Sequence, residues 1–256
     1  MTGAPAALAG WMEQRGIARL SVVSPHLDDA VYSLAAMLAR PDLPPRKVFT
    51  VFTAAGPMTD QGFARATGFA DAEEEHACRR GEDQRAMARL GLPFEHCGIE
   101  SGRSDDALAA LVAGRVLEGP APDRHVVLLP LGAGAALHPV RKALCRVLRR
   151  PPGAPAHGEH VLVRDQMRAR LRPAGVHVGY YAELPYQWAN GAGDLARLAE
   201  RLIGGATAPF RIVPDPDAKL AVAKEYESQT ALILGTRPGY QRRVVGIPER
   251  VFLPAG

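Results

Sequence analysis

"LSVVSPHLDDAVYSL", residues Leu20 to Leu34, joins a short apolar run to a histidine and two aspartates. The apolar run has the length and β-branched content of a buried strand, and Pro25 ends it. A helix-like segment follows, so His26, Asp28 and Asp29 occupy a turn between a strand and a helix. Ligands of parallel sheets bind beyond the carboxyl ends of the strands, which is where such a turn lies. The stretch therefore predicts both an α/β fold and the position of its functional residues.

The alternation of strands and helices continues along the chain. Strands are predicted at residues 18–24, 47–53, 94–99, 125–131, 177–184 and 210–213. Helices are predicted at residues 31–39, 72–90, 105–117, 139–149, 158–172 and 216–234. This order predicts a Rossmann-like, mainly parallel sheet flanked by helices on both faces. Because the alternation resumes after the proline-rich loop at 149–158, we expect a single domain over residues 1–256.

Composition indicates a soluble globular protein, with 256 residues of which 47% are hydrophobic. No apolar run approaches the ~20 residues of a membrane span. The N-terminus lacks the pattern of a secretory signal. Cys78, Cys97 and Cys145 are widely spaced and odd in number, which favours reduced thiols. We therefore expect a cytoplasmic protein with no membrane partner.

The net charge of +4 comes mainly from arginine. In nucleic-acid-binding proteins, basic residues are often clustered and interleaved with aromatic residues. The arginines of this chain are dispersed and show no such pattern. We therefore expect no nucleic-acid partner. A protein partner is not readable from the sequence.

The turn itself has two interpretations. A histidine and a carboxylate three residues apart can converge on a divalent metal, with the intervening carboxylate directed at a metal-bound water. Alternatively, Asp28 or Asp29 caps the following helix while His26 packs against the turn. Two adjacent carboxylates repel each other and a cap needs only one, which favours the metal site.

The segment "SPHLDDAVYSL" resembles the signature of the PIG-L (LmbE-like) family, zinc amidohydrolases that remove acetyl groups from amino sugars. Further resemblances follow in chain order, and together they cover nearly the whole chain: "RRGEDQRAMARLG", "LLPLG", "YYAELPY", "EYESQ" and "PERVF". The resemblance implies that His26 and Asp29 bind Zn²⁺ and that Asp28 is the general base. It also implies a small-molecule substrate, an N-acetylated amino sugar or a related metabolite.

The resemblance further implies a third ligand, a histidine in an "HPDH"-like or "HVDH"-like turn. The chain instead has "GAGAALHPVRKALCRVL" from residue 132. In one alignment Arg141 replaces the ligand histidine, so a permanent cation lies near a metal that lacks its third ligand. In the other alignment a residue has been lost from the loop and His138 is the ligand. We favour His138, the only histidine of this loop, and expect Arg141 or His138 to stabilise the tetrahedral intermediate or protonate the leaving amine.

Other polar residues receive simpler interpretations. His157 and His160 follow the proline-rich loop and can fold over the mouth of the site, but we expect them to be solvated. We expect Glu73, Glu74 and Glu75 to form a solvent-facing side of their helix. Tyr186 and Trp188 are candidates for stacking on a sugar ring, although aromatic residues there can equally serve packing.

Two functions follow from the sequence. The first is a zinc-dependent deacetylase. The second is a metal-free member of the same fold, which has lost its third ligand and binds a ligand or partner protein or catalyses different chemistry.

Overall fold

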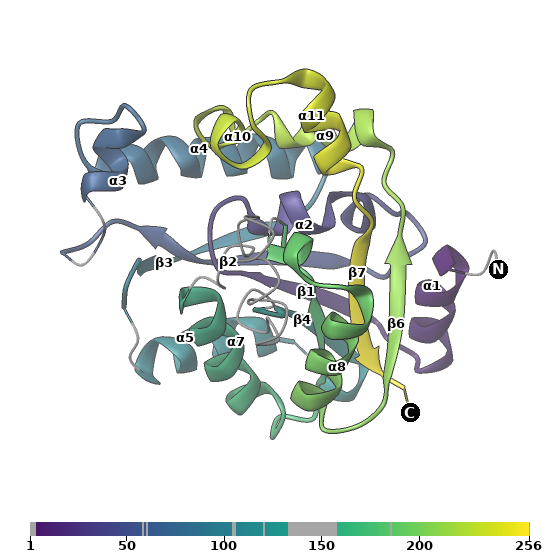
Figure 1. Ribbon diagram of the computed structural model, residues 1–256. Helices are drawn as coiled ribbons and strands as arrows, with labels where there is room; N and C mark the ends of the chain where they lie inside the picture. Colours follow the sequence, from purple (N-terminus) through teal and green to yellow (C-terminus); the bar gives the residue numbers. More distant parts are fainter. Residues whose placement is uncertain are drawn as a thin grey trace, which may run out of the picture.

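The computed structural model describes residues 4–57, 59, 61–103, 106–119, 121–132, 158–184 and 186–255. The chain is built on a seven-stranded sheet of strand order β3-β2-β1-β4-β5-β7-β6 (Figure 1). The strands are β1 (Arg19–Ser24), β2 (Arg46–Ala54), β3 (Phe94–Glu100), β4 (His125–Pro130), β5 (His177–Tyr181), β6 (Thr207–Ile212) and β7 (Glu249–Pro254). Strands β1 to β5 pair in parallel, whereas β7 runs antiparallel to β5 and β6. The mainly parallel sheet is confirmed, but strand β7 was not predicted.

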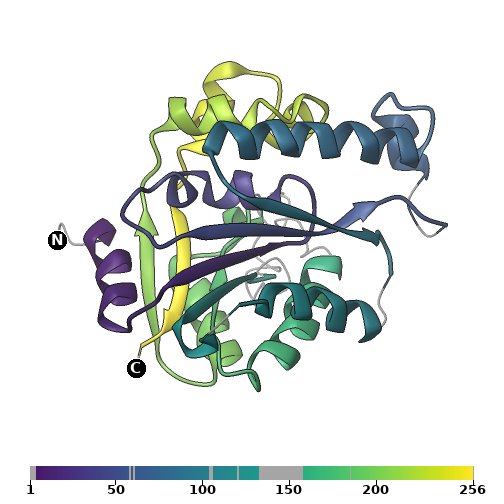
Figure 2. The same ribbon diagram turned by 180° about the vertical axis from the view of Figure 1, so that it is seen from behind.

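Helices cover both faces of the sheet, as predicted (Figures 1 and 2). One face carries α2 (Asp29–Leu38), α4 (Ala72–Leu90), α9 (Pro216–Ala223), α10 (Glu227–Leu234) and α11 (Pro238–Val245). The other face carries α5 (Asp106–Leu117), α7 (Gly158–Leu171) and α8 (Ala192–Ile203). Helix α1 (Ala4–Gln14) lies beside β6, and the short α3 (Gln61–Ala66) contacts α4. Helices α1, α3, α8 and α11 were not predicted.

Each central strand buries both of its faces. In β1, Val22 belongs to the apolar cluster beneath α2 and α4, and Val23 to the cluster beneath α5 and α7. In β4, Leu128 and Leu129 alternate in the same way. This double burial explains why the strands are continuous apolar runs in the sequence.

Helix α4 has the bounds that its sequence predicts. Asp71 occupies the N-cap, and its side chain accepts a hydrogen bond from the backbone N–H of Glu74. Gly91 ends the helix in the left-handed region, with φ of 64°. Local signals at both ends were therefore sufficient to place this element.

The single helix predicted over residues 216–234 is wrong, because α9 and α10 are separate helices. Tyr226, between them, is completely buried, and its hydroxyl donates to Asp83 Oδ1 at 2.6 Å. Asp83 lies in α4, so this hydrogen bond fixes Tyr226 against α4 at the break between α9 and α10, although the local sequence there is compatible with a continuous helix. The helix predicted over residues 139–149 lies outside the described residues.

In the described part of the chain, no helix is long and apolar enough to cross a membrane. Cys78 and Cys97 are free thiols, as predicted, and Cys145 lies outside the described residues.

Candidate metal and catalytic site

Hydrogen bonds within the turn after β1 hold its polar side chains in place. Ser24 Oγ donates to the carbonyl oxygen of His26 at 2.7 Å and accepts from the backbone N–H of Ala30 at 3.1 Å. The carboxylate of Asp29, at the start of α2, accepts from the backbone N–H of His26 at 2.9 Å. Asp28 stands at the N-cap position of α2 but makes no side-chain capping hydrogen bond. The capping interpretation is therefore wrong for Asp28.

Helix α7 brings a third donor to this turn. His160 lies in the first turn of α7 and is only 1% exposed. Its Nε2 is 3.2 Å from Asp29 Oδ2, and the same oxygen is 3.1 Å from His26 Nδ1. One donor atom from each of these three residues lies within 4.8 Å of the others. His26, Asp29 and His160 thus form a compact cluster that could hold a metal ion.

The expectation that His160 is solvated is wrong. Helix α7 packs against β4 and α5, and its His160 is buried beside Asp29 of the turn that follows β1. His138 and Arg141 lie outside the described residues, so their predicted roles stay predictions. A sequence signal for His160 did exist: "HGEH", residues 157–160, has the two histidines and the intervening acid of the "HPDH" pattern.

Both histidines of the cluster also face a carboxylate on their other ring nitrogen. His26 Nε2 is 2.7 Å from Glu159 Oε2, and His160 Nδ1 is 3.2 Å from Glu183 Oε1. Glu159 precedes His160 in α7, and Glu183 follows β5. Such carboxylates orient metal-binding imidazoles in many metalloproteins. Sequence reasoning missed both glutamates because each depends on a contact between distant segments.

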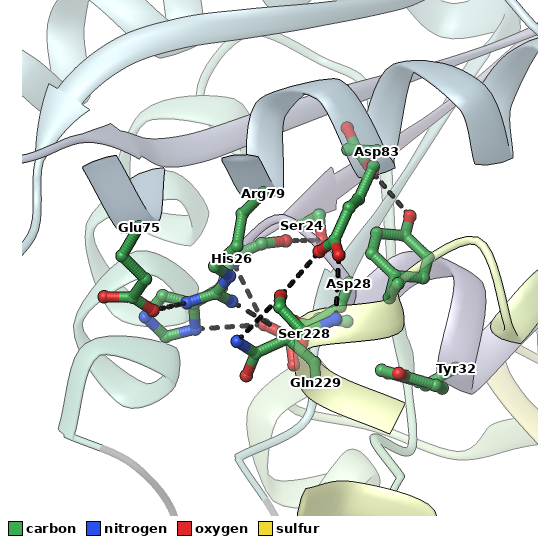
Figure 3. Close-up of polar contacts among 12 residues, drawn as sticks. Ser24, His26, Asp28, Tyr32, Glu75, Arg79, Asp83, Ser228 and Gln229 are labelled. Carbon is green, nitrogen blue, oxygen red and sulfur yellow. Dashed lines mark hydrogen bonds and ion pairs between the residues drawn. The ribbon is translucent and has the colours of Figure 1, made fainter. Parts of the chain in front are cut away.

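Asp28 faces a buried cation on the opposite side of the turn (Figure 3). Its Oδ2 is 3.5 Å from Arg79 Nη2, and Arg79 Nη1 is 3.2 Å from Glu75 Oε1. Glu75 and His76 are 1% and 4% exposed, so the expectation of a solvent-facing side is wrong at Glu75, and His76 is buried with it. Because Glu75 pairs with Arg79 inside the protein, only Glu73 and Glu74 of the acidic run face solvent.

Opposite environments separate the two neighbouring aspartates. Burial raises the pKa of Asp28 to about 6, although the positive charge of Arg79 opposes this rise. Burial also works against ionisation of Asp29, but His160 and His26 hold the pKa of its carboxyl well below its usual range. Asp29 is thus a permanent anion suited to binding a cation, whereas Asp28 can take up and release a proton near neutral pH.

Neighbouring carboxylates favour the protonated form of both histidines of the cluster. Burial alone would lower the pKa of His160, yet Asp29 and Glu183 raise it to about 10. Burial likewise opposes protonation of His26, but Asp29 and Glu159 raise the pKa of its imidazole above the usual value. A metal ion entering the cluster must therefore displace protons.

Tyr186 borders the cluster, as its predicted substrate-binding role requires. Its ring packs edge-on against His160 with centroids 5.1 Å apart. The side chain of Trp188 lies outside what the structure describes, so its role stays a prediction.

Hydrogen bonds join the segment "EYESQ" to helix α4, and Figure 3 draws two of its residues, Ser228 and Gln229, together with Asp28. The backbone N–H and hydroxyl of Ser228 donate to the two oxygens of Glu82 at 2.8 and 2.7 Å. Asp83, next to Glu82, accepts from Tyr226 and lies 2.8 Å from His96 Nε2. These contacts fix the start of α10 against α4, the helix that carries Arg79.

No family model matches the chain. Over 187 residues it is 25% identical to the 2'-N-acetylparomamine deacetylase of Streptomyces fradiae, a match that covers 70% of this chain. The matched region is 61% of that relative, so the chain spans less than two thirds of its length.

Two solved structures share the fold over almost the whole chain. The A40926 pseudoaglycone deacetylase Dbv21 has a TM-score of 0.66 at 23% identity, covering 93% of this chain and 96% of its own. The zinc inhibited form of teicoplanin deacetylase Orf2 has a TM-score of 0.63 at 20% identity, covering 92% of this chain and 97% of its own. The chain therefore has the fold of these deacetylases, and the resemblance to the PIG-L (LmbE-like) deacetylases that its sequence carries is confirmed.

Proposed function

We propose that the protein is a zinc-dependent hydrolase that removes the acetyl group from an N-acetylated amino sugar or a related small metabolite. The observation that carries this proposal is the convergence of His26, Asp29 and His160 on one point. Two imidazoles and one carboxylate are a donor set typical of catalytic zinc, which keeps its fourth position open. The names of the curated relative and of the structures with this fold support an acetylated amino sugar as the substrate class.

The chain's own residues supply the remaining chemistry. Zinc held by the cluster would act as a Lewis acid on the acetyl carbonyl oxygen and acidify a bound water. Asp28 accepts the proton of the attacking water at its carboxylate, and it then holds that proton for the leaving amine. The positive charge of Arg79, 3.5 Å from Asp28 Oδ2, favours the ionised form of that carboxylate. Tyr186 offers an aromatic face next to His160.

The metal-free alternative depended on the absence of a third ligand. His160 provides an imidazole within reach of Asp29, which supports the zinc-dependent enzyme over that alternative.

Metal content and acetate release together test the proposal. Purified protein should contain about one zinc per chain and release acetate from a panel of N-acetylated amino sugars. Chelation should abolish this activity and added zinc should restore it, while His160→Ala should show neither metal nor activity. Activity that is indifferent to chelation, or metal-free protein after purification with added zinc, would refute the proposal.

Several expectations about the surroundings of the site stay predictions. They are the single domain over residues 1–256, the cytoplasmic location, and the absence of nucleic-acid and membrane partners.

A further inference from the structure

Glu183 is a buried carboxylate to which the proposed reaction gives no task. It follows β5 and is 0% exposed. Its Oε1 accepts a hydrogen bond from the backbone N–H of Gly132 at 2.7 Å and lies 3.2 Å from His160 Nδ1. Its Oε2 is buried and has no hydrogen-bond partner among the described residues. A carboxylate in such surroundings is costly unless positive charge lies close by, and Glu183 contacts the imidazole of His160.

The two nitrogens of the His160 ring face different groups. Nε2 points to Asp29 Oδ2 and the metal cluster, while Nδ1 points to Glu183. A metal-binding histidine commonly donates its other N–H to a carboxylate, which fixes both the tautomer and the ring orientation. With a metal in the cluster, Glu183 would hold the proton on Nδ1, so that Nε2 would be the nitrogen available as a ligand.

Glu183 also joins the segments that carry the site. Its two partners come from different elements, because Gly132 follows β4 and His160 lies in the first turn of α7. Leu184, the residue after Glu183, donates its backbone N–H to Ser33 Oγ of α2 at 3.1 Å. The carboxylate of Glu183 therefore connects the end of the sheet to the helix that brings the third ligand.

We propose that Glu183 is a positioning residue for the metal ligand His160, setting its tautomer and orientation and thereby the affinity of the cluster for zinc. This inference rests on the proposed zinc site.

Zinc affinity, measured by competition with a coloured chelator, tests the role of Glu183. Glu183→Ala should weaken zinc binding by about 10- to 100-fold. Glu183→Gln keeps an acceptor oxygen for the Nδ1 proton, so it should restore part of that loss. The matched control is Glu249→Gln, an equally buried carboxylate whose Oε1 pairs with Lys219 Nζ at 2.7 Å away from the cluster. The control should lower the melting temperature and leave the zinc affinity unchanged.

A second readout separates orientation from general destabilisation. The visible spectrum of the Co²⁺-loaded protein reports ligand geometry, and it should change in Glu183→Gln but not in Glu249→Gln. If Glu183→Ala does not fold, the affinity and spectrum of Glu183→Gln decide. Wild-type zinc affinity and an unchanged Co²⁺ spectrum in Glu183→Gln would overturn the inference. Failure of the wild-type protein to bind zinc would overturn the proposed function instead.

Discussion

At the scale of single residues, Asp28 and Asp29 are neighbours with separate tasks. Asp29 Oδ2 contacts both histidines, whereas Asp28 contacts Arg79. We expect Asp28→Asn to keep its zinc while losing at least 10²-fold in kcat, the usual contribution of a general base. Asp29→Asn should instead lose zinc because it removes the anionic ligand. Zinc content and acetate release check both variants, and equal loss of metal in the two would show that their roles are misassigned.

The third ligand is the second residue-scale prediction. Removal of one of three protein ligands should weaken zinc binding severely, so His160→Ala is expected to purify without metal. His138→Ala, measured alongside, tests the assignment made from the sequence. Zinc retained in His160→Ala but lost in His138→Ala would instead support the alignment in which His138 of the "HPVR" turn is the third ligand.

Proton release on metal binding follows from the same histidine. With a pKa of about 10, His160 is protonated at pH 7.5 before the metal binds. Zinc should therefore displace at least about one proton per chain, whereas a histidine of ordinary pKa would release only ~0.1. Apparent zinc affinity should accordingly rise with pH between 7 and 9. Titration calorimetry in two buffers of different ionisation enthalpy counts the protons, and a count well below one would contradict the charge state of the site.

At the scale of elements, helix α4 supports the site because it carries Arg79 and the residues that anchor α10. Its N-cap depends on Asp71, which accepts from Glu74 N–H at 2.9 Å. Asp71→Ala should lower the free energy of unfolding by ~1 kcal/mol, and Asp71→Asn, which keeps a capping oxygen, by only a few tenths. Urea denaturation measures both, and equal losses would mean that capping is not the cause.

Helix α7 shows how an element can determine a site that lies far away in the sequence. It begins directly at Gly158, so Glu159 and His160 leave its first turn toward the carboxyl end of the sheet. The helix itself was predicted correctly from its spacing. Its docking against β4 and α5, which buries His160 and leaves Glu159 partly exposed, was not predicted because periodicity does not specify the partner of a helix face.

At the scale of the whole molecule, acid stability depends on histidines buried without a charge partner. His125, at the start of β4, is 0% exposed, its Nε2 is 2.8 Å from Ser21 Oγ, and burial lowers its pKa to about 4. The ordinary value of 6.5 applies to the unfolded chain, which therefore binds more protons between pH 6.5 and 4. As the pH decreases from 6.5 to 4, the free energy of unfolding should therefore fall by on the order of 2 to 3 kcal/mol. Above pH 6.5, His125 should have no effect on it.

A matched variant isolates this effect from the other histidines. His125→Gln keeps a polar group opposite Ser21 but cannot titrate, so its unfolding free energy should decline less between pH 6.5 and 4 than that of the wild type. Parallel pH profiles for the two proteins would contradict the buried, neutral state of His125.

The sequence by itself determined whatever is local. The first βα turn, with His26, Asp28 and Asp29 within four residues, and the ends of α4 all follow from short-range hydrogen bonding and capping. The parallel order of the first five strands follows from the alternation of elements, since crossover helices force that direction. These features need no knowledge of distant contacts.

Tertiary structure alone decided what depends on distant contacts. His160 becomes the third donor because α7 folds against β4, and Glu75 becomes internal because Arg79 turns toward Asp28. Strand β7 joins the sheet against β5 and β6, and Tyr226 interrupts a helix to reach Asp83. Each of these features depends on contacts between segments that are distant in the sequence, and the free energies of such contacts exist only after those segments have met.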